Sequence, residues 1–334
     1  MGARVIPGFD NMDNKKLFIG QNISGYKHIL DYLYDRYYKN FTEHSDVTSA
    51  YWKTIGKQEV SKKNGYQVKG HAFGSYRNKS LINQLKHIPM KILLSYHFRK
   101  YHIPKKFLQA QETILNRYGV YGSVDSYKQI LSYYTILKTL DNKDKVTPEK
   151  LSSICIIGDG YGFLANFIKL VHPDIRVISV NLGRTLLFDV LYSEKCFPDV
   201  NPLLLITEEN KDLQLSTSKI VFIEAENYSL LENLNVDLFI NIASMQEMNP
   251  EVINEYIKYM RTSKKSPCYF YCCNRVEKEL PDGTLIEFKN YIWENSDNVL
   301  IDELCPWYQE YPSVRPPFFR SYDGPVQHRL TKLH

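Results

Sequence analysis

Short apolar runs alternate with amphipathic stretches through the second part of the chain. The pattern predicts strands near residues 153–157, 175–180, 219–224, 236–242 and 267–273, and helices near residues 161–171, 184–195 and 249–262. Regular alternation of strand and helix is typical of a parallel sheet wound by helices on both faces. We therefore predict an α/β fold for this part, with ligands bound beyond the carboxyl ends of the strands.

The first part of the chain has a helical pattern. In residues 26–41 apolar side chains recur every four positions, which predicts one broad apolar helix face. Pro104 suits the first turn of another helix, and Gly119 suits its end. A further helix is expected over residues 126–140, so the N-terminal region should be mostly helical.

Two polar stretches interrupt these elements. Residues 56–80 carry several glycines and lysines and predict a loop or a hairpin that could move over a site. Residues 141–150 are polar and contain a proline, which marks the expected domain boundary. We expect a basic, helical substrate or lid region over residues 1–145 and the α/β domain over residues 146–334.

Charge is distributed unevenly along the chain. The formal net charge is +5, but residues 1–145 hold 24 basic and 11 acidic residues, a net +13, which leaves −8 for the remainder. No acidic residue lies between Glu59 and Glu112. Such a field would attract an anionic glycan, an anionic lipid surface or nucleic acid. A solvated basic face opposite an acidic second part explains the same pattern equally well.

All six cysteines follow residue 154, and several lie inside apolar, strand-like runs. No Cys-x-x-Cys pair has a second pair or a histidine partner, so buried free thiols are expected rather than a zinc site. Free thiols suit a reducing compartment. No apolar run approaches the roughly 18 residues that a bilayer span requires. We expect a soluble, cytoplasmic protein with, at most, a peripheral contact to an anionic surface.

A glycine-rich turn directly follows the first predicted strand of the α/β domain. It consists of Gly158, Asp159, Gly160, Tyr161 and Gly162. Glycines let a backbone turn sharply and approach a ligand, and the next helix start offers N–H groups to an anion. The turn suits a dinucleotide pyrophosphate or the carboxylate of S-adenosylmethionine. Phe163 stands where the dinucleotide fingerprint needs a small residue, and no Gly-Lys-Ser/Thr ending is present, so NAD, FAD and P-loop sites are disfavoured.

Polar residues follow the next predicted strands. Asn181 lies where nucleotide-binding domains place the group that receives the ribose hydroxyls, although an amide lacks the strength of a carboxylate. Glu226 could reach an adenine or ribose group. Each of these side chains could equally be a turn or cap residue. The predicted cofactor contacts at these strand ends are Asn181, Leu182, Glu226, Asn241 and Ser244.

Longer blocks carry a family resemblance. The stretches IGDGYGFLA, NLGRTLLFDVLYSEKCFP, DLFINIASMQEMNPEVINEYIKYMR and YFYCCNR occur in this order, and over about residues 150–280 the chain resembles the bacterial sugar O-methyltransferase family. The match is thinner around YWK at 51–53 and HRL at 328–330. The resemblance implies a class I, S-adenosylmethionine-dependent methyltransferase with a Rossmann-like sheet. It also implies methyl transfer to a sugar hydroxyl of a surface polysaccharide or its precursor, with an anionic or lipid-linked glycan as the expected acceptor.

The chain departs from this family at two places. Ile156 stands where the family usually has Glu, and residues 181–184 read Asn-Leu-Gly-Arg instead of Asp-Leu-Pro-Glu. Two carboxylates that would complement a cationic cofactor are therefore missing. Either Glu226 and backbone groups compensate, or cofactor affinity is reduced. One alternative is a non-catalytic subunit with a decayed cofactor site. Another is a nucleic-acid methyltransferase, which the NIAS stretch disfavours because it lacks a proline-aromatic base pocket.

Methyl transfer to a hydroxyl requires in-line alignment and removal of a proton. His328, in the expected final strand VQHRLTKL, is the first candidate base because an unperturbed histidine titrates near neutral pH. Glu247, after the fourth predicted strand, is the second. Arg275 could bind a substrate phosphate or carboxylate, and His71 could reach across the site as a lid residue. No metal-ligand set is predicted, which leaves metal dependence open.

Overall fold

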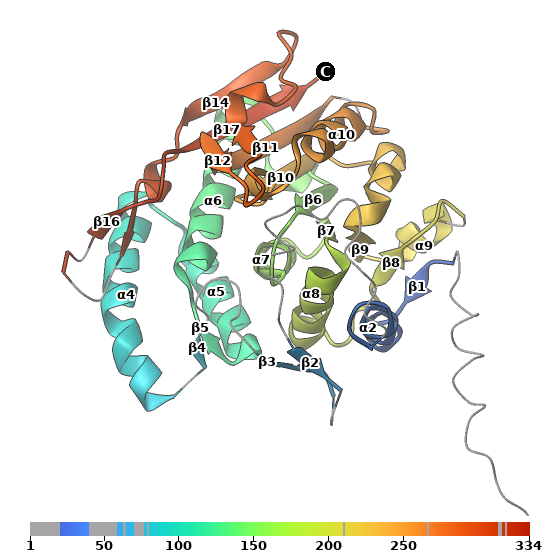
Figure 1. Ribbon diagram of the computed structural model, residues 1–334, viewed down its shortest axis with the longest axis horizontal. Helices are drawn as coiled ribbons and strands as arrows, with labels where there is room; N and C mark the ends of the chain where they lie inside the picture. The colour runs from blue at the N-terminus through green and yellow to red at the C-terminus, as the bar shows by residue number, and fades with distance from the viewer. Residues whose placement is uncertain are drawn as a thin grey trace, which may run out of the picture.

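A twisted sheet forms the centre of the computed structural model (Figure 1), which describes residues 21–39, 59–62, 65–69, 77–78, 80–209, 211–265, 267–312, 316–317 and 319–334. Within these residues, nine strands join one sheet in the order β1-β8-β9-β7-β6-β10-β11-β17-β14. Strands β8 through β11 in this order are parallel, whereas β1 and β17 are antiparallel to their neighbours. The sheet strands are β1 (Ile23–Ser24), β6 (Ser153–Ile157), β7 (Arg176–Asn181), β8 (Leu203–Leu205), β9 (Ile220–Glu224), β10 (Leu238–Ile242), β11 (Cys268–Arg275), β14 (Asn298–Leu304) and β17 (Val326–Leu333).

Helices and short hairpins complete the described chain. The longer helices are α2 (Tyr26–Tyr34), α4 (Leu81–Lys100), α5 (Lys105–Tyr118), α6 (Val124–Asp144), α7 (Phe163–Val171), α8 (Gly183–Cys196), α9 (Lys211–Thr217) and α10 (Pro250–Arg261). A π-helical turn, η1 (Asp35–Lys39), extends α2. The 3-10 segments are η2 (Pro148–Lys150), η3 (Ala225–Asn233), η4 (Met245–Glu247), η5 (Phe288–Asn290) and η6 (Pro306–Tyr308). Two-stranded pairs are β2 (Glu59–Ser61) with β3 (Gln67–Lys69), β4 (Arg77–Asn78) with β5 (Val120–Tyr121), β12 (Glu277–Glu279) with β13 (Leu285–Glu287), and β15 (Glu310–Pro312) with β16 (Phe319–Ser321).

The predicted fold class is confirmed. All five strands predicted for the α/β domain are present as β6, β7, β9, β10 and β11, and the three helices predicted between them are α7, α8 and α10. The VQHRLTKL stretch forms β17, as expected, and β2 with β3 forms a hairpin inside the stretch predicted to be a loop or hairpin. The pattern did not single out α4, β8, α9 or β14. The signal of β8 and α9 is too short, because they span only three and seven residues.

Local signals fix the helices that precede the sheet. Helix α5 ends at Gly119, whose backbone is left-handed with φ of 72°, as its position predicted. Helix α6 begins two residues earlier than expected because the Ser123 side chain caps it and accepts a hydrogen bond from the Ser126 backbone N–H at 3.2 Å. The described part of the N-terminal region is thus mostly helical.

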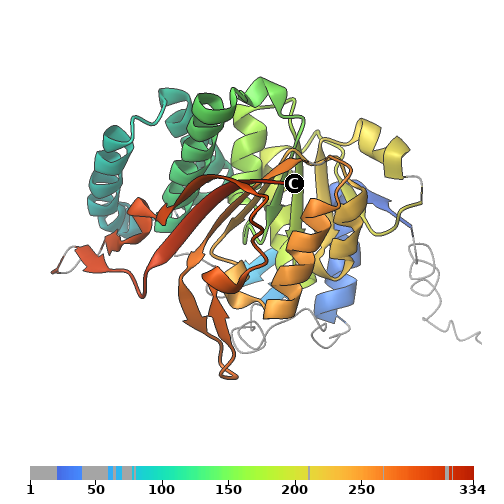
Figure 2. The same cartoon turned by 90° about the horizontal axis from the view of Figure 1, so that it is seen from above.

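The two faces of the sheet are covered by different helices, which Figure 2 shows from above. Helices α5, α6 and α7 pack on one face, where α8 and α2 continue the layer toward β8. Helix α10 and segment η3 cover the other face. Burial on both faces explains why β6, β9 and β10 read as continuous apolar runs rather than alternating ones.

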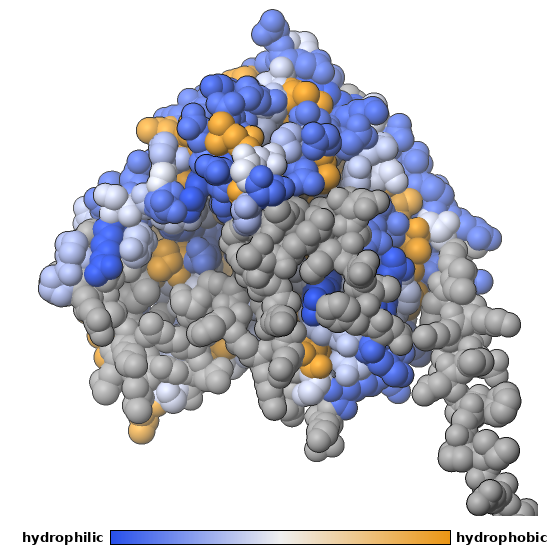
Figure 3. All heavy atoms as spheres, viewed as in Figure 1, coloured by the Kyte–Doolittle hydropathy of each residue, from blue (hydrophilic) through white to orange (hydrophobic). Residues whose placement is uncertain are grey.

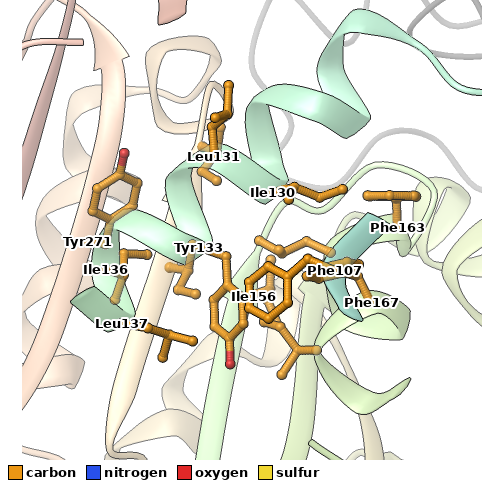
Figure 4. Close-up of a cluster of buried hydrophobic side chains, with 14 of the residues drawn as sticks. Phe107, Ile130, Leu131, Tyr133, Ile136, Leu137, Ile156, Phe163, Phe167 and Tyr271 are labelled. Atoms are coloured by element: carbon orange, nitrogen blue, oxygen red, sulfur yellow. The ribbon is translucent and has the colours of Figure 1, made fainter. Parts of the chain in front are cut away.

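An aromatic cluster joins the N-terminal helices to the sheet (Figure 4). Phe107 of α5 and Tyr133 of α6 both meet the ring of Phe167 on α7 edge to face, with ring centroids 5.2 Å and 6.2 Å apart. Phe163 and Ile156 are 1% and 2% exposed and belong to the same core. The helical region and the sheet therefore share one hydrophobic core, and neither Phe163 nor Ile156 points away from it.

Where the face seen in Figure 3 is coloured, its atoms are mostly hydrophilic, with apolar atoms in small separate groups. All six cysteines are buried and unpaired, as their positions predicted. In the part of the chain that the structure describes, no helix combines the length and apolar character needed to cross a membrane.

Candidate functional site

A central hollow opens at the carboxyl ends of four parallel strands, where the strand order reverses between β6 and β10. Its cavity volume is about 50 Å³, below the ~300–1,000 Å³ usual for small-molecule sites, so most of a larger ligand would lie in its open mouth. Each of β6, β7, β9 and β10 supplies residues from the position predicted for it. The described residues that line the hollow are Gly158, Gly160, Val180, Asn181, Leu182, Thr185, Ala225, Ser244, Glu247, Met248, Val252 and Tyr256.

The three glycines of the turn are needed for different reasons. All three have positive φ, between 64° and 79°. A Cβ on Gly158 would lie 2.2 Å from Ser244 Oγ, and one on Gly162 would lie 3.2 Å from the Asp189 Cα on α8. A Cβ on Gly160 would meet no atom within 4 Å. The first and third glycines thus allow close packing, whereas Gly160 presents bare backbone to open space inside the hollow.

The side chains between these glycines turn away from the hollow. Asp159 accepts hydrogen bonds from the backbone N–H groups of Leu164 and Ala165 at 3.0 and 2.7 Å, so it caps the start of α7. Tyr161 is buried against Phe188 of α8, with ring centroids 5.2 Å apart. Both residues shape the turn that was predicted to contact a cofactor, but neither lines the hollow.

Two carboxyl groups are buried beneath the turn. Burial raises the pKa of Asp159 to about 6, against the effect of its N–H donors. Burial also raises the pKa of Asp189 well above its usual value, and the neighbouring Asp159 charge adds to that shift. One oxygen of Asp189 has no hydrogen-bond partner among the described residues. A cationic group nearby would favour the charged form of either carboxyl.

Asn181 lies at the edge of this pair and lines the hollow. Its amide N–H donates to Asp189 Oδ2 at 3.2 Å, and its amide oxygen accepts from the Leu182 backbone N–H at 3.0 Å. The side chain is 8% exposed. The amide thus connects the end of β7 to α8 and keeps one more donor and acceptor position toward the hollow. Asp189 was not expected from the sequence, because a single acidic residue within a helix carries no pattern of its own.

A network of buried polar side chains supports the hollow at the ends of β6, β10 and β11. The Asn241 amide donates to the Ile157 carbonyl at 2.9 Å and to Ser244 Oγ at 2.5 Å, while Asn274 Nδ2 donates to Asn241 Oδ1 at 2.8 Å. Ala243 has a φ of 60°, a strained value for a residue with a side chain. This bend returns the Ser244 hydroxyl to β6, where it donates to the Ile157 carbonyl at 3.0 Å. Ser244 lines the hollow, and Asn241 holds the three strand ends together beneath it.

The π-helical turn η1 contacts the residues at the end of β9 and the start of α8. The Arg36 guanidinium pairs with Glu226 at 2.8 Å, and the Tyr37 hydroxyl donates to Glu224. Glu224 is 1% exposed, and burial raises the pKa of its carboxyl despite the Arg36 charge. The Tyr37 ring also reaches Gly183, where a Cβ would clash with it. Glu226, predicted as a cofactor contact, is therefore engaged by the helix and does not line the hollow.

Glu247 is the one carboxylate among the described residues that line the hollow. It lies in η4, directly after the Ser244 bend, and pairs with the Lys278 ammonium at 2.9 Å. Both side chains are mostly buried, at 13% and 12% exposure. Its position at the mouth is the one expected from the sequence.

The other predicted catalytic and substrate residues lie outside this lining. His328 is 1% exposed on β17, opposite Cys273, and its Nδ1 lies 3.1 Å from the Tyr271 hydroxyl. Burial lowers the pKa of His328, against the effect of Glu303. Arg275 is the last residue of β11 and pairs with the exposed Asp323 at 3.1 Å. His71 lies outside the described residues.

The fold has some similarity to solved structures of methyltransferases, at low sequence identity. One is TrmN from Thermus thermophilus, at 9% identity and a TM-score of 0.36, with 62% of this chain and 49% of that one covered. A second is a precorrin-6y C5,15-methyltransferase from Geobacter metallireducens, at 11% identity, a TM-score of 0.35 and coverage of 55% and 80%. The mitomycin 7-O-methyltransferase MmcR is a third, at 8% identity, a TM-score of 0.34 and coverage of 62% and 57%.

The chain spans about half the length of TrmN in this comparison. No family model matches the sequence, and no curated protein matches it. The resemblance to sugar O-methyltransferases therefore stays an expectation from the sequence, and the geometry of the hollow carries the functional conclusion.

Proposed function

We propose that the chain is an S-adenosylmethionine-dependent O-methyltransferase that methylates a sugar hydroxyl of a polysaccharide or its precursor. The observation that carries the proposal is the bare backbone at Gly160, which faces open space in a hollow built from four strand ends. The sugar acceptor rests on the sequence resemblance alone.

The residues around the hollow fit the parts of this cofactor. The backbone at Gly160 and the start of α7 would receive its amino-acid end, and Asn181 would face the ribose hydroxyls. Ala225, Val252 and Tyr256 supply apolar surface suited to an adenine ring. The buried carboxyl groups beneath the turn would complement its positive charge, which offsets the missing carboxylate at position 181.

Glu247 is the better placed of the two predicted bases, because it lines the hollow and His328 does not. The cofactor supplies a methyl group on a positively charged sulfur, so its transfer to an oxygen leaves a neutral thioether. Glu247 would accept the hydroxyl proton as the oxygen–carbon bond forms. The Lys278 ammonium at 2.9 Å fixes the carboxylate at the mouth of the hollow.

A non-catalytic subunit is the second candidate, and one observation favours it. Glu226, the acid that could have compensated for Asn181, is paired with Arg36 instead of facing the hollow. In that case the hollow would keep its shape but bind the cofactor weakly or not at all.

A titration with S-adenosylhomocysteine separates these candidates. Under the main proposal the product stabilises the protein, by about 2.7 kcal/mol at a ligand concentration of 100 Kd. No stabilisation at millimolar product would refute it and favour the non-catalytic subunit. Mass spectrometry of surface glycans from cells with and without the protein would then reveal the loss of one methyl group. Glu247→Gln should keep product binding and lower methylation by about 10²–10⁴-fold.

A further inference from the structure

The ammonium group of Lys128 lies between two tyrosine rings and near the carboxyl group of Asp125. Lys128 of α6 is 3% exposed, and the described residues offer its Nζ neither a hydrogen bond nor an ion pair. It lies between two aromatic rings, 3.9 Å from the centroid of Tyr308 and 4.2 Å from that of Tyr322. Burial lowers the pKa of Lys128 to about 8, although the nearby Asp125 carboxylate opposes the shift. The two rings stabilise the cation, but among the described residues it donates to no oxygen acceptor.

A second cation approaches the same ring from the sheet. The Arg275 guanidinium lies 5.6 Å from the Tyr322 centroid, and its buried Nε finds no acceptor among the described residues. Its ion pair with a described residue is with Asp323, whose side chain is 90% exposed. An ion pair with so exposed a partner contributes little, so the guanidinium remains available to another anion. Lys128 and Arg275 therefore both approach the ring of Tyr322, and among the described residues neither has a buried carboxylate as its ion-pair partner.

Two hydrogen bonds connect this cluster to the elements around the hollow. The Arg275 backbone N–H donates to Gln246 Oε1 at 2.7 Å, and Gln246 lies in η4 between Ser244 and Glu247 of the lining. Gln129, next to Lys128, donates to Asp159 Oδ1 in the glycine turn at 3.3 Å. Gln129 and Gln246 thus connect the cluster to the glycine turn and to η4, which both contribute residues to the lining of the hollow.

We propose that Lys128 and Arg275 bind an anionic oxygen group of the methyl acceptor, a carboxylate or a phosphate, in a site walled by Tyr308 and Tyr322. Two cationic donors match the oxygen atoms of such a group, and the aromatic rings offer a surface for an adjoining sugar ring. The assignment of this group to the methyl acceptor rests on the proposed function, whereas the anion site can be tested without it.

Calorimetric titrations with glucuronate, inorganic phosphate and glucose test the site. Glucuronate, phosphate or both should bind the wild-type protein at low ionic strength, and glucose should bind at least tenfold more weakly. Preference for glucuronate would indicate a uronic acid, and preference for phosphate a phosphorylated glycan. Lys128→Met should weaken anion binding at least tenfold, because it keeps the length of the side chain and removes the charge. Lys138→Met, at an exposed position of the same helix, should leave it unchanged.

Two results would overturn the proposal: no anion binding to the wild-type protein, or equal binding to wild type and Lys128→Met. If that variant does not fold, the pH dependence of wild-type glucuronate binding decides. Affinity should fall about tenfold from pH 7 to pH 9 as Lys128 loses its proton, and a flat profile would overturn the site. A parallel titration with S-adenosylhomocysteine tests the proposed function separately, so either can fail while the other stands.

Discussion

Gly160→Val tests whether the hollow is a cofactor site. The new side chain would enter open space, because its Cβ would meet no atom within 4 Å in the free protein. Its φ of 79° is unfavourable for a β-branched residue and should cost about 1–2 kcal/mol of folding stability. A ligand that contacts this backbone must then move away or be excluded. We expect the Kd for S-adenosylhomocysteine to rise at least about a hundredfold, or 2.7 kcal/mol.

Gly283→Val separates the two effects. Gly283 has a φ of 85°, and its Cβ would also meet no atom within 4 Å, but it lies in the exposed turn between β12 and β13. Both variants should lose similar stability in urea unfolding. At 100 times the wild-type Kd, the ligand should stabilise wild type and Gly283→Val by about 2.7 kcal/mol but Gly160→Val by only about 0.4 kcal/mol. A calorimetric Kd for Gly160→Val within threefold of wild type would refute the assignment of the hollow.

Three further substitutions test the surroundings of the site. Asn181→Asp should lower the free energy of unfolding by about 1–3 kcal/mol at pH 7, because it removes the donor to Asp189 and adds a third buried carboxyl. The loss should shrink toward pH 5 as these carboxyl groups take up protons. An unchanged unfolding midpoint at pH 7 would contradict this prediction. His328→Ala should destabilise by about 1–3 kcal/mol, since it leaves the Tyr271 hydroxyl without its partner, but should not change the calorimetric Kd for S-adenosylhomocysteine; a large change in Kd would bring His328 into the cofactor site. Asp237→Asn should cost about 1–3 kcal/mol at pH 7. Burial disfavours the charged carboxylate of Asp237, but Lys265 and backbone N–H groups favour it, so its pKa is lowered. Its contribution is therefore complete above the unfolded pKa of about 3.9, and the wild-type advantage in urea unfolding should vanish as pH falls below that value.

The sequence was sufficient to predict the strands that position the hollow. The apolar runs that became β6, β7, β9 and β10 were visible because strands buried on both faces must be continuously apolar. Since parallel strands place their carboxyl ends at one edge, the residues after them could be expected to meet. Gly158, Gly160, Asn181, Leu182, Ser244 and Glu247 do line one hollow.

The partners of these residues could not be read in the same way. Periodicity assigns a side chain to a face of its element but does not say which distant element packs on that face. Arg36 engages Glu226, and Lys128 meets Tyr308 and Tyr322, across separations of well over a hundred residues. The burial of Asp189 beside Asp159 arises only when α8 packs against the glycine turn.

Local patterns in the chain thus determined the strands, the helices and the bare turn, because these depend on nearest neighbours and on the conformational freedom of glycine. The tertiary structure decided which charges are buried, which are paired and which remain unused. That outcome depends on packing between segments far apart in the sequence, and burial is what gives Lys128, Asp189 and Glu224 their altered pKa values.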